Sequence, residues 1–133
     1  AVGATAQARA AVALTIGYAH DRRVFGRELA AFQNTKFEIA AVATEVEAAQ
    51  SLLDRAVAAL VAGELSPADA AMVKLFCTEA QGRVTDRCLQ VFGGYGYVRE
   101  YPIARLFADA RVTRIYGGTS EVMKSIISKS LGL

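Results

Sequence analysis

Apolar residues recur at every third or fourth position along most of this chain, and little interrupts that spacing. The spacing places apolar side chains along one side of a helix, whereas a half-buried strand requires strict alternation. Proline breaks helices, and only Pro67 and Pro102 occur. The sequence therefore predicts an all-α protein, and its 53% hydrophobic content is enough for a buried core.

We expect five helices, approximately over residues 1–20, 34–61, 67–92, 102–113 and 119–130. Gly63 fits the end of the second helix, and Ser66 with Pro67 fits the start of the third, so these two long helices are antiparallel neighbours. Small residues on the first helix permit close packing. The expected architecture is an up-and-down four-helix bundle with short additional C-terminal helices, as a single domain over residues 1–133.

The two long helices each have an apolar side. In the second helix it carries Ile39, Val42, Val46, Ala49, Leu53, Ala56 and Leu60. In the third helix it carries Val73, Cys77, Ala80, Val84, Cys88 and Val91. The other side of the third helix carries Lys74, Thr78, Gln81 and Thr85.

Composition and charge exclude several classes of function. Lys and Arg number 15 and Asp and Glu number 13, which gives no electrostatic reason to expect a nucleic acid or an anionic membrane partner. No apolar run is long enough to span a bilayer. His20 is the only histidine, and we expect it to cap a helix or to face solvent. A di-iron centre, a Ser-His-Asp group or a Cys-His pair therefore has no basis, and no metal is expected.

The two cysteines, Cys77 and Cys88, lie on one predicted helix, roughly 16 Å apart, and cannot pair with each other. Together with the lack of a signal peptide, this favours a reducing compartment, either the cytoplasm or an organelle matrix. The chain starts at Ala1, without methionine and inside a predicted helix, which suggests a piece of a longer protein.

The segment after the first helix combines positive charge, an aromatic ring, a turn glycine and an amide, in Arg22, Phe25, Gly26 and Gln33. Arginine binds phosphate through paired donors, and the aromatic ring and amide suit a flat heterocycle. This segment can therefore bind a dinucleotide. The alternative is an ordinary turn in which Phe25 plugs the end of the bundle.

Two more glycine-rich segments follow predicted helices. Residues 90–97 include three glycines, which expose backbone groups to a ligand or simply form a helix cap and a turn. Gly117 and Gly118 lead into Thr119, where hydroxyl groups and free amides at a helix start suit a pyrophosphate or serve only to cap the helix.

In this order and at these intervals, the motifs resemble those of the acyl-CoA dehydrogenase family over nearly the whole chain. They are Arg22-x-x-Phe25-Gly26 with Gln33, Gln90-x-x-Gly93-Gly94-x-Gly96, Glu100-Tyr101-Pro102, Asp109-Ala110 and Ile115-Tyr116-Gly117-Gly118-Thr119-Ser120-Glu121. The part that matches is the family's C-terminal four-helix domain, which completes the FAD site and drives formation of a homotetramer. The resemblance implies a parent enzyme that oxidises an acyl-CoA to a trans-2-enoyl-CoA through FAD, with electron-transfer flavoprotein as the acceptor, in the bacterial cytoplasm or, less favoured, the mitochondrial matrix.

The resemblance also implies roles for individual residues. The FAD of a neighbouring subunit would be contacted by Arg22, at its pyrophosphate, and by Phe25, Leu29 and Gln33. Its adenosine portion would be held by Gln90, Val91, Phe92, Gly93 and Gly94. Thr119 and Glu121 match positions near the phosphates and ribose of the cofactor, and Tyr116 with Gly117 would line the acyl cavity.

Gly117 stands where short- and medium-chain members of the family carry their catalytic glutamate. In this respect the chain is similar to long-chain and isovaleryl-type members, which supply the glutamate from a position upstream of Ala1. The resemblance thus implies that this chain holds no catalytic residue and is inactive alone, and that the space beside Tyr116 admits a long or branched acyl group.

Two alternatives remain open. A related flavin monooxygenase or oxidase would share the flavin-binding loops, and a helical assembly module would use the apolar sides for subunit contacts without catalysis. In either case the isolated chain is expected to self-associate, because a domain that normally packs against others leaves apolar area exposed.

Overall fold

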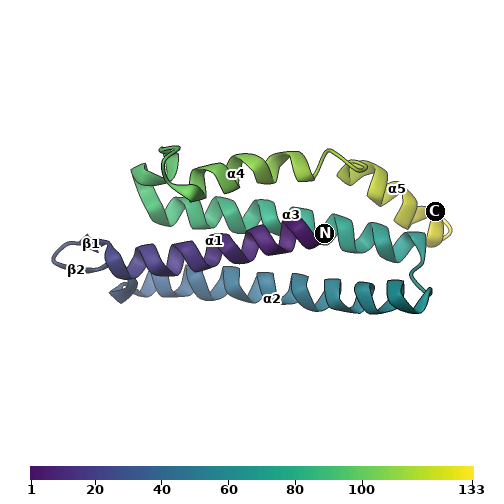
Figure 1. The fold of residues 1–133 in the computed structure, drawn as a ribbon, viewed down its shortest axis with the longest axis horizontal. Coiled ribbons are helices and arrows are strands. Elements are labelled where there is room, and N and C mark those ends of the chain that lie inside the picture. The colour runs from purple at the N-terminus through teal and green to yellow at the C-terminus, as the bar shows by residue number, and fades with distance from the viewer.

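The computed structural model describes residues 1–133, most of which lie in helices (Figure 1). The five α-helices are α1 (Val2–Asp21), α2 (Gln33–Ala62), α3 (Pro67–Phe92), α4 (Pro102–Thr113) and α5 (Ser120–Ser130). Two short strands, β1 (Arg23–Val24) and β2 (Arg27–Glu28), form an antiparallel hairpin, and two 3-10 helices are η1 (Leu29–Ala31) and η2 (Gly93–Tyr97). The predicted all-α class is confirmed, and the hairpin is a local addition that the sequence did not predict.

The helices form the predicted bundle. α1, α2 and α3 lie side by side, and α4 and α5 follow one another along α3, so that together they take the fourth position (Figure 1). α3 packs against each of the other four helices. The loop at Gly117 and Gly118, both with positive φ, separates α4 from α5.

The reversal between α2 and α3 has the predicted caps. Gly63 adopts a left-handed conformation with φ of 74°, and its N–H donates to the Leu60 carbonyl at 3.1 Å. The Ser66 hydroxyl accepts from the Asp69 N–H at 3.0 Å, and Pro67 occupies the first turn of α3. These caps satisfy backbone groups that the helix ends would otherwise leave unpaired.

Two clusters of buried apolar side chains form the core. One contains Ala8, Ala11, Val12, Val42, Val46, Val84, Cys88, Phe92 and Ile103. The other contains Ala4, Ala49, Leu53, Ala56, Val73, Cys77 and Ala80. Leu60, the last member of the predicted apolar side of α2, is instead 63% exposed. The reason is that α1 begins near the middle of the bundle and leaves the far end of α2 uncovered (Figure 1).

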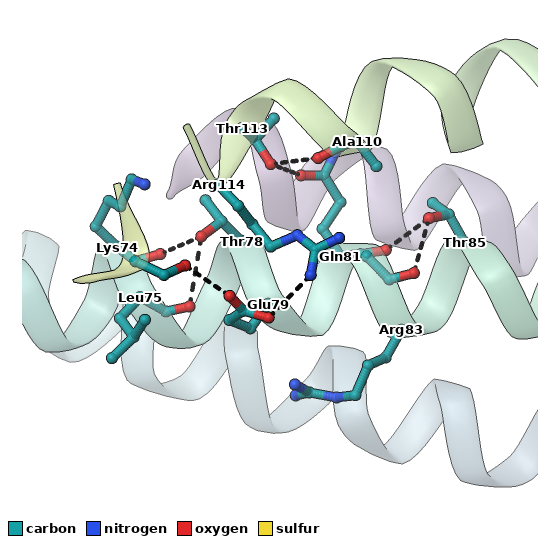
Figure 2. Close-up of polar contacts among 12 residues, drawn as sticks. Lys74, Leu75, Thr78, Glu79, Gln81, Arg83, Thr85, Ala110, Thr113 and Arg114 are labelled. Carbon is teal, nitrogen blue, oxygen red and sulfur yellow. Dashed lines mark hydrogen bonds and ion pairs between the residues drawn. The ribbon is translucent and has the colours of Figure 1, made fainter. Parts of the chain in front are cut away.

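The polar side of α3 is also buried. Thr78, Gln81 and Thr85 are almost fully covered, because α3 is central and other helices pack against both of its sides. The Thr78 and Thr85 hydroxyls donate to carbonyls one turn earlier in α3, at 2.9 and 2.8 Å (Figure 2). These internal hydrogen bonds allow threonine to occupy a core position in a helix.

Gln81 is 0% exposed and links three helices. Its side-chain amide donates to Gln7 Oε1 at 2.6 Å. Its Oε1 accepts from the Thr113 hydroxyl at 2.7 Å (Figure 2). A buried amide with its donor and acceptor both used fixes the arrangement of its neighbours, because any displacement leaves a polar group unpaired.

Cys77 and Cys88 are free and buried, as their spacing on one helix predicted. None of the helices combines the length and the apolar character that a membrane crossing requires.

Candidate functional site

The first candidate site is a cavity of about 440 Å³ at the end of the bundle where α1 and α3 meet. It lies between the hairpin that follows α1 and the η2 segment that follows α3. Its lining residues are Tyr18, Arg22, Val24, Leu29, Val91, Phe92, Gly93, Gly94, Tyr95 and Val98. Six of the residues predicted to bind a cofactor thus come together here from two segments far apart in the sequence.

Aromatic contacts shape this cavity. The Tyr18 and Phe92 rings stack with their centres 4.1 Å apart, and the Tyr18 hydroxyl donates to the Phe92 carbonyl at 3.2 Å. Burial raises the pKa of Tyr18 above its ordinary value, although the nearby Arg22 charge acts in the opposite direction. The guanidinium of Arg22 itself lies over the Tyr95 ring. The positive charge is therefore held at the edge of an otherwise apolar cavity.

The hairpin holds Arg22 in place from the other side. The Leu29 N–H donates to the Arg22 carbonyl at 2.7 Å, and Arg23 donates to the Gly26 carbonyl at 2.9 Å. His20, in the last turn of α1, is exposed and lies 3.5 Å from the Glu28 carboxylate. The expected capping or solvent role of His20 agrees with this position.

The predicted site residue Gln90 borders an adjoining hollow of about 410 Å³. This hollow shares Leu29 and Val91 with the first cavity. An ion pair between Arg87 and Glu38, at 2.8 Å, lines its wall. The two hollows adjoin near the end of α3, and we refer to them together as the groove.

Phe25 and Gln33 do not reach this groove. The prediction that Phe25 could plug the bundle is wrong, because Phe25 sits at the hairpin tip and is 95% exposed. Its backbone has φ of 50°, which is uncommon for a residue with a side chain, and its ring lies edge-on to Phe32 at 6.4 Å. Gln33 starts α2 and is exposed. Both side chains point to solvent and are free to meet another molecule.

The groups around the groove suit a nucleotide with a phosphate. Arg22 supplies a fixed positive charge, and the surrounding rings supply apolar walls. A Cβ atom at Gly93 or Gly94 would meet no other atom of this chain within 4 Å, so the space over these two residues is open and their backbone groups are accessible. The groove can therefore accept an anionic group and a flat ring side by side.

The second candidate site is the loop over residues 114–119, between α4 and α5. Gly117 and Gly118 have φ of 64° and 98°, and Tyr116 is 62% exposed. Thr119 caps α5, accepting from the Val122 N–H at 3.3 Å. The capping interpretation of Thr119 is therefore confirmed.

Glu121 lies in the first turn of α5 and is exposed. Its pKa is lowered by hydrogen bonds to its own backbone N–H and to the Thr119 hydroxyl. Its carboxylate therefore competes for the donors that a phosphate would need at this helix start.

Three charged residues that the sequence analysis did not select, Lys74, Glu79 and Arg114, hold the loop against α3. Glu79 accepts from the Ser120 hydroxyl at 2.6 Å and from Arg114 at 3.2 Å. The Lys74 ammonium donates to the Gly118 carbonyl at 2.6 Å. The only sequence feature that concerns them is that Lys74 lies on the same side of a helix as three polar residues. That pattern does not show whether these side chains make buried polar contacts or face solvent.

These contacts shift two pKa values. The Ser120 hydrogen bond lowers the pKa of Glu79, with burial opposing it and Arg114 adding to it. Burial lowers the pKa of Lys74, and the Glu79 and Glu121 charges oppose that change. The loop is thus fixed by charged groups that are partly removed from water.

The two candidate sites are separate within one chain. Glu79 and Phe92 mark their positions on α3, and they lie roughly 20 Å apart along the helix at about 1.5 Å per residue. Arg22 and the glycines of η2 therefore do not share a cavity with Thr119, Glu121 or Tyr116. No group of three or more His, Cys, Asp or Glu side chains is placed to hold a metal ion.

Comparison with known proteins identifies the family. The profile described as "Acyl-CoA dehydrogenase, C-terminal domain" matches residues 1–132. An acyl-CoA dehydrogenase from Bacillus subtilis is 40% identical over 134 residues, covering 98% of this chain and 35% of the relative. An acryloyl-CoA reductase (NADH) from Anaerotignum propionicum is 39% identical over 124 residues, covering 93% of this chain and 32% of the relative.

A solved structure agrees with these matches. A glutaryl-CoA dehydrogenase from Mycobacterium smegmatis in complex with FADH2 superposes with a TM-score of 0.93 at 27% identity, covering 97% of this chain and 33% of that chain. The chain thus spans about a third of the length of the relatives that it matches.

Proposed function

The chain belongs to the acyl-CoA dehydrogenase family as its C-terminal domain, and on this premise we propose that its parent protein is an FAD-dependent acyl-CoA dehydrogenase. In this proposal the parent converts an acyl-CoA thioester to the trans-2-enoyl-CoA and passes electrons to an electron-transfer flavoprotein. The observation that carries it is the groove at the end of α3, where Arg22 and the open backbone of Gly93 and Gly94 meet from separate segments.

The groove would hold the nucleotide part of FAD. Arg22 would bind the pyrophosphate, because its guanidinium is fixed at the edge of the groove by the Tyr95 ring. Leu29, Gln90, Val91, Phe92 and the two glycines would contact the adenosine portion. When bound, FAD would supply the acceptor for the hydride that leaves the β-carbon of the acyl group.

The exposed positions of Phe25 and Gln33 fit a cofactor that belongs to a neighbouring subunit. In a single chain these side chains contact no cavity, and a second chain would have to approach the hairpin for them to contribute. We therefore propose a homo-oligomer, a tetramer in the complete enzyme, in which each FAD lies between two chains. Sedimentation of the full-length protein tests this, and a monomer with full FAD content would contradict it.

The loop at 114–119 would face the acyl group. Tyr116 is exposed, and a Cβ atom at Gly117 would meet nothing within 4 Å, which leaves room for a long or branched substrate. Glycine cannot abstract a proton, so the base that removes the α-proton would come from residues before Ala1. The 133-residue chain alone would then be inactive.

The decisive experiment uses the full-length protein. It should purify with the visible absorbance of oxidised flavin, and anaerobic titration with straight and branched acyl-CoA should bleach that absorbance. A protein that retains no flavin, or whose flavin no acyl-CoA reduces, would contradict the proposal. Oxygen consumption without an added acceptor would instead favour an oxidase or monooxygenase.

A second candidate is reduction of an enoyl-CoA, which the similarity to an acryloyl-CoA reductase favours. The same flavin and the same loops would serve both directions. Turnover of enoyl-CoA with reduced electron-transfer flavoprotein, compared with turnover of acyl-CoA with the oxidised form, separates the two. We propose a reducing compartment for the enzyme, because Cys77 and Cys88 are free thiols, and of the two candidates we favour the bacterial cytoplasm over the mitochondrial matrix.

A further inference from the structure

We propose that Lys74 and Glu79 of α3 are positioning residues, which clamp the loop over residues 114–119 so that Tyr116 and Gly117 are presented to the acyl group in one arrangement. This inference rests on the proposed function of that loop. It adds two residues that make no contact with a substrate but act through the loop.

Glu79 holds both ends of the loop. One carboxylate oxygen accepts from Ser120, the first residue of α5, and the other accepts from Arg114, directly after α4 (Figure 2). The Ser120 N–H also donates to the Arg114 carbonyl at 3.2 Å, which closes the loop on itself. A single side chain on α3 therefore fixes the entry and the exit of the loop together.

Arg114 fits closely against α3 because position 82 is glycine. A Cβ atom there would lie 3.3 Å from the guanidinium carbon of Arg114. The Arg114 Nε atom is buried and has no hydrogen-bond partner, so the Glu79 carboxylate is the only acceptor paired with this guanidinium. The contact is a charge-assisted hydrogen bond between two side chains that are each about 30% exposed, at 31% for Arg114 and 30% for Glu79.

Lys74 holds the middle of the loop. Its ammonium donates to the carbonyl of Gly118, the residue with φ of 98°. A Cβ atom at Gly118 would lie 2.5 Å from Met123 Cε, so the backbone here is pressed against the first turns of α5. Lys74 therefore contacts the loop at a residue whose positive φ favours glycine.

The part of the loop between these anchors has no side-chain hydrogen bond of its own. The N–H groups of Ile115 and Tyr116 bond to the Val112 carbonyl at the end of α4, at 2.9 and 3.1 Å. These two backbone bonds hold Ile115 and Tyr116 to the end of α4, and the side-chain contacts that fix the rest of the loop come from Lys74 and Glu79.

The test compares Glu79→Gln and Lys74→Met with the wild type in the full-length, FAD-loaded enzyme. Glu45→Gln is the matched control, since Glu45 also pairs with an arginine of α3, Arg83, but lies away from the loop. Lys74→Arg is the conservative variant that keeps a donor for the Gly118 carbonyl. The measurements are KM and kcat per bound flavin, and hydrogen exchange of the 115–119 amides.

Both disruptive variants should raise KM for acyl-CoA about tenfold and speed exchange of the loop amides, because each loses a charge-assisted hydrogen bond. Lys74→Arg should stay within about twofold of wild type, and Glu45→Gln should change neither quantity. Kinetics per flavin equal to those of Glu45→Gln, or losses explained entirely by missing flavin, would overturn the proposal.

Glu79→Gln and Lys74→Met remove different contacts to the loop. If one of these variants does not fold, the other still tests the proposal. If no acyl-CoA reduces the flavin of the wild-type enzyme, both the proposed function and this role of Lys74 and Glu79 are contradicted. If the variants are active and hydrogen exchange of the 115–119 amides is unchanged, only the positioning role of Lys74 and Glu79 is contradicted.

Discussion

The guanidinium carbon of Arg22 lies 5.2 Å from the centre of the Tyr95 ring. This contact joins the residue after α1 to the η2 segment after α3, and so connects the two halves of the groove. An interaction of this kind at a partly exposed site contributes about 0.5–1 kcal/mol. It also orients the guanidinium, which a flexible ammonium group in its place would not reproduce.

Arg22→Lys should therefore weaken retention of FAD by the full-length enzyme about tenfold, because paired donation to a phosphate is lost while the charge remains. The measurement is the dissociation constant of FAD, followed by flavin fluorescence on dilution. Arg23→Lys is the control, since Arg23 bonds only to the Gly26 carbonyl within the hairpin. Equal affinities for the two variants would contradict the role of Arg22.

Gly96→Ala should lower the free energy of unfolding by about 1–3 kcal/mol through overpacking. A Cβ atom at Gly96 would lie 2.6 Å from the Leu89 carbonyl oxygen, and that backbone atom cannot move aside without displacing the last turn of α3. Gly94→Ala is the control, because its Cβ would meet nothing within 4 Å. Urea unfolding measures both, and a difference below about 0.5 kcal/mol would contradict this account.

Gln81→Met should cost about 1–3 kcal/mol of stability, since it keeps the volume but leaves a polar group without its partner. The Gln7 side chain loses its partner, whereas the Thr113 hydroxyl keeps the Ala110 carbonyl as an acceptor at 2.7 Å. The double variant Gln81→Met, Thr113→Val should be less destabilised than the sum of the single variants, because two partners are removed together. Additive losses in thermal unfolding would show that the hydrogen bond between Gln81 and Thr113 contributes nothing.

Glu79 should make stability depend on pH in the acid range. Its pKa in the folded state is lowered from an ordinary value of 4.5, first by Ser120 and also by Arg114 and Arg83. The unfolded state therefore binds the proton more readily, so this contribution is present above pH 4.5 and is lost as the pH falls through the folded pKa.

Denaturant unfolding across that range measures the effect. Below pH 4.5, the free energy of unfolding should depend less on pH in Glu79→Gln than in the wild type. Identical pH profiles for wild type and Glu79→Gln would rule out this linkage.

Much of the fold could be predicted from the sequence, because its signals are local. The caps at Gly63 and Ser66 and the apolar sides of α2 and α3 depend on residues within a few turns of one another. Burial of Gln81 could not be predicted, because it depends on helices that pack from elsewhere in the chain. Exposure of Leu60 has the same origin, since it follows from where α1 begins.

The residues of the candidate sites also fall into those that the sequence indicates and those that only the structure reveals. Arg22, Leu29 and the glycines of η2 stand out by residue type, and the structure brings them together. Lys74 and Glu79 carry no such mark, since a lysine and a glutamate on a helix usually face water. Only the path of the loop after α4 gives them a role.

The central position of α3 has a consequence for the evolution of the chain. Because the groove and the loop over residues 114–119 are both attached to this one helix, the length of α3 sets the distance between them. Inserting one residue between Glu79 and Phe92 would move one end by about 1.5 Å and turn it by about 100°. An insertion in the turn between α2 and α3 would leave that distance unchanged, whereas one within α3 between Glu79 and Phe92 would alter it.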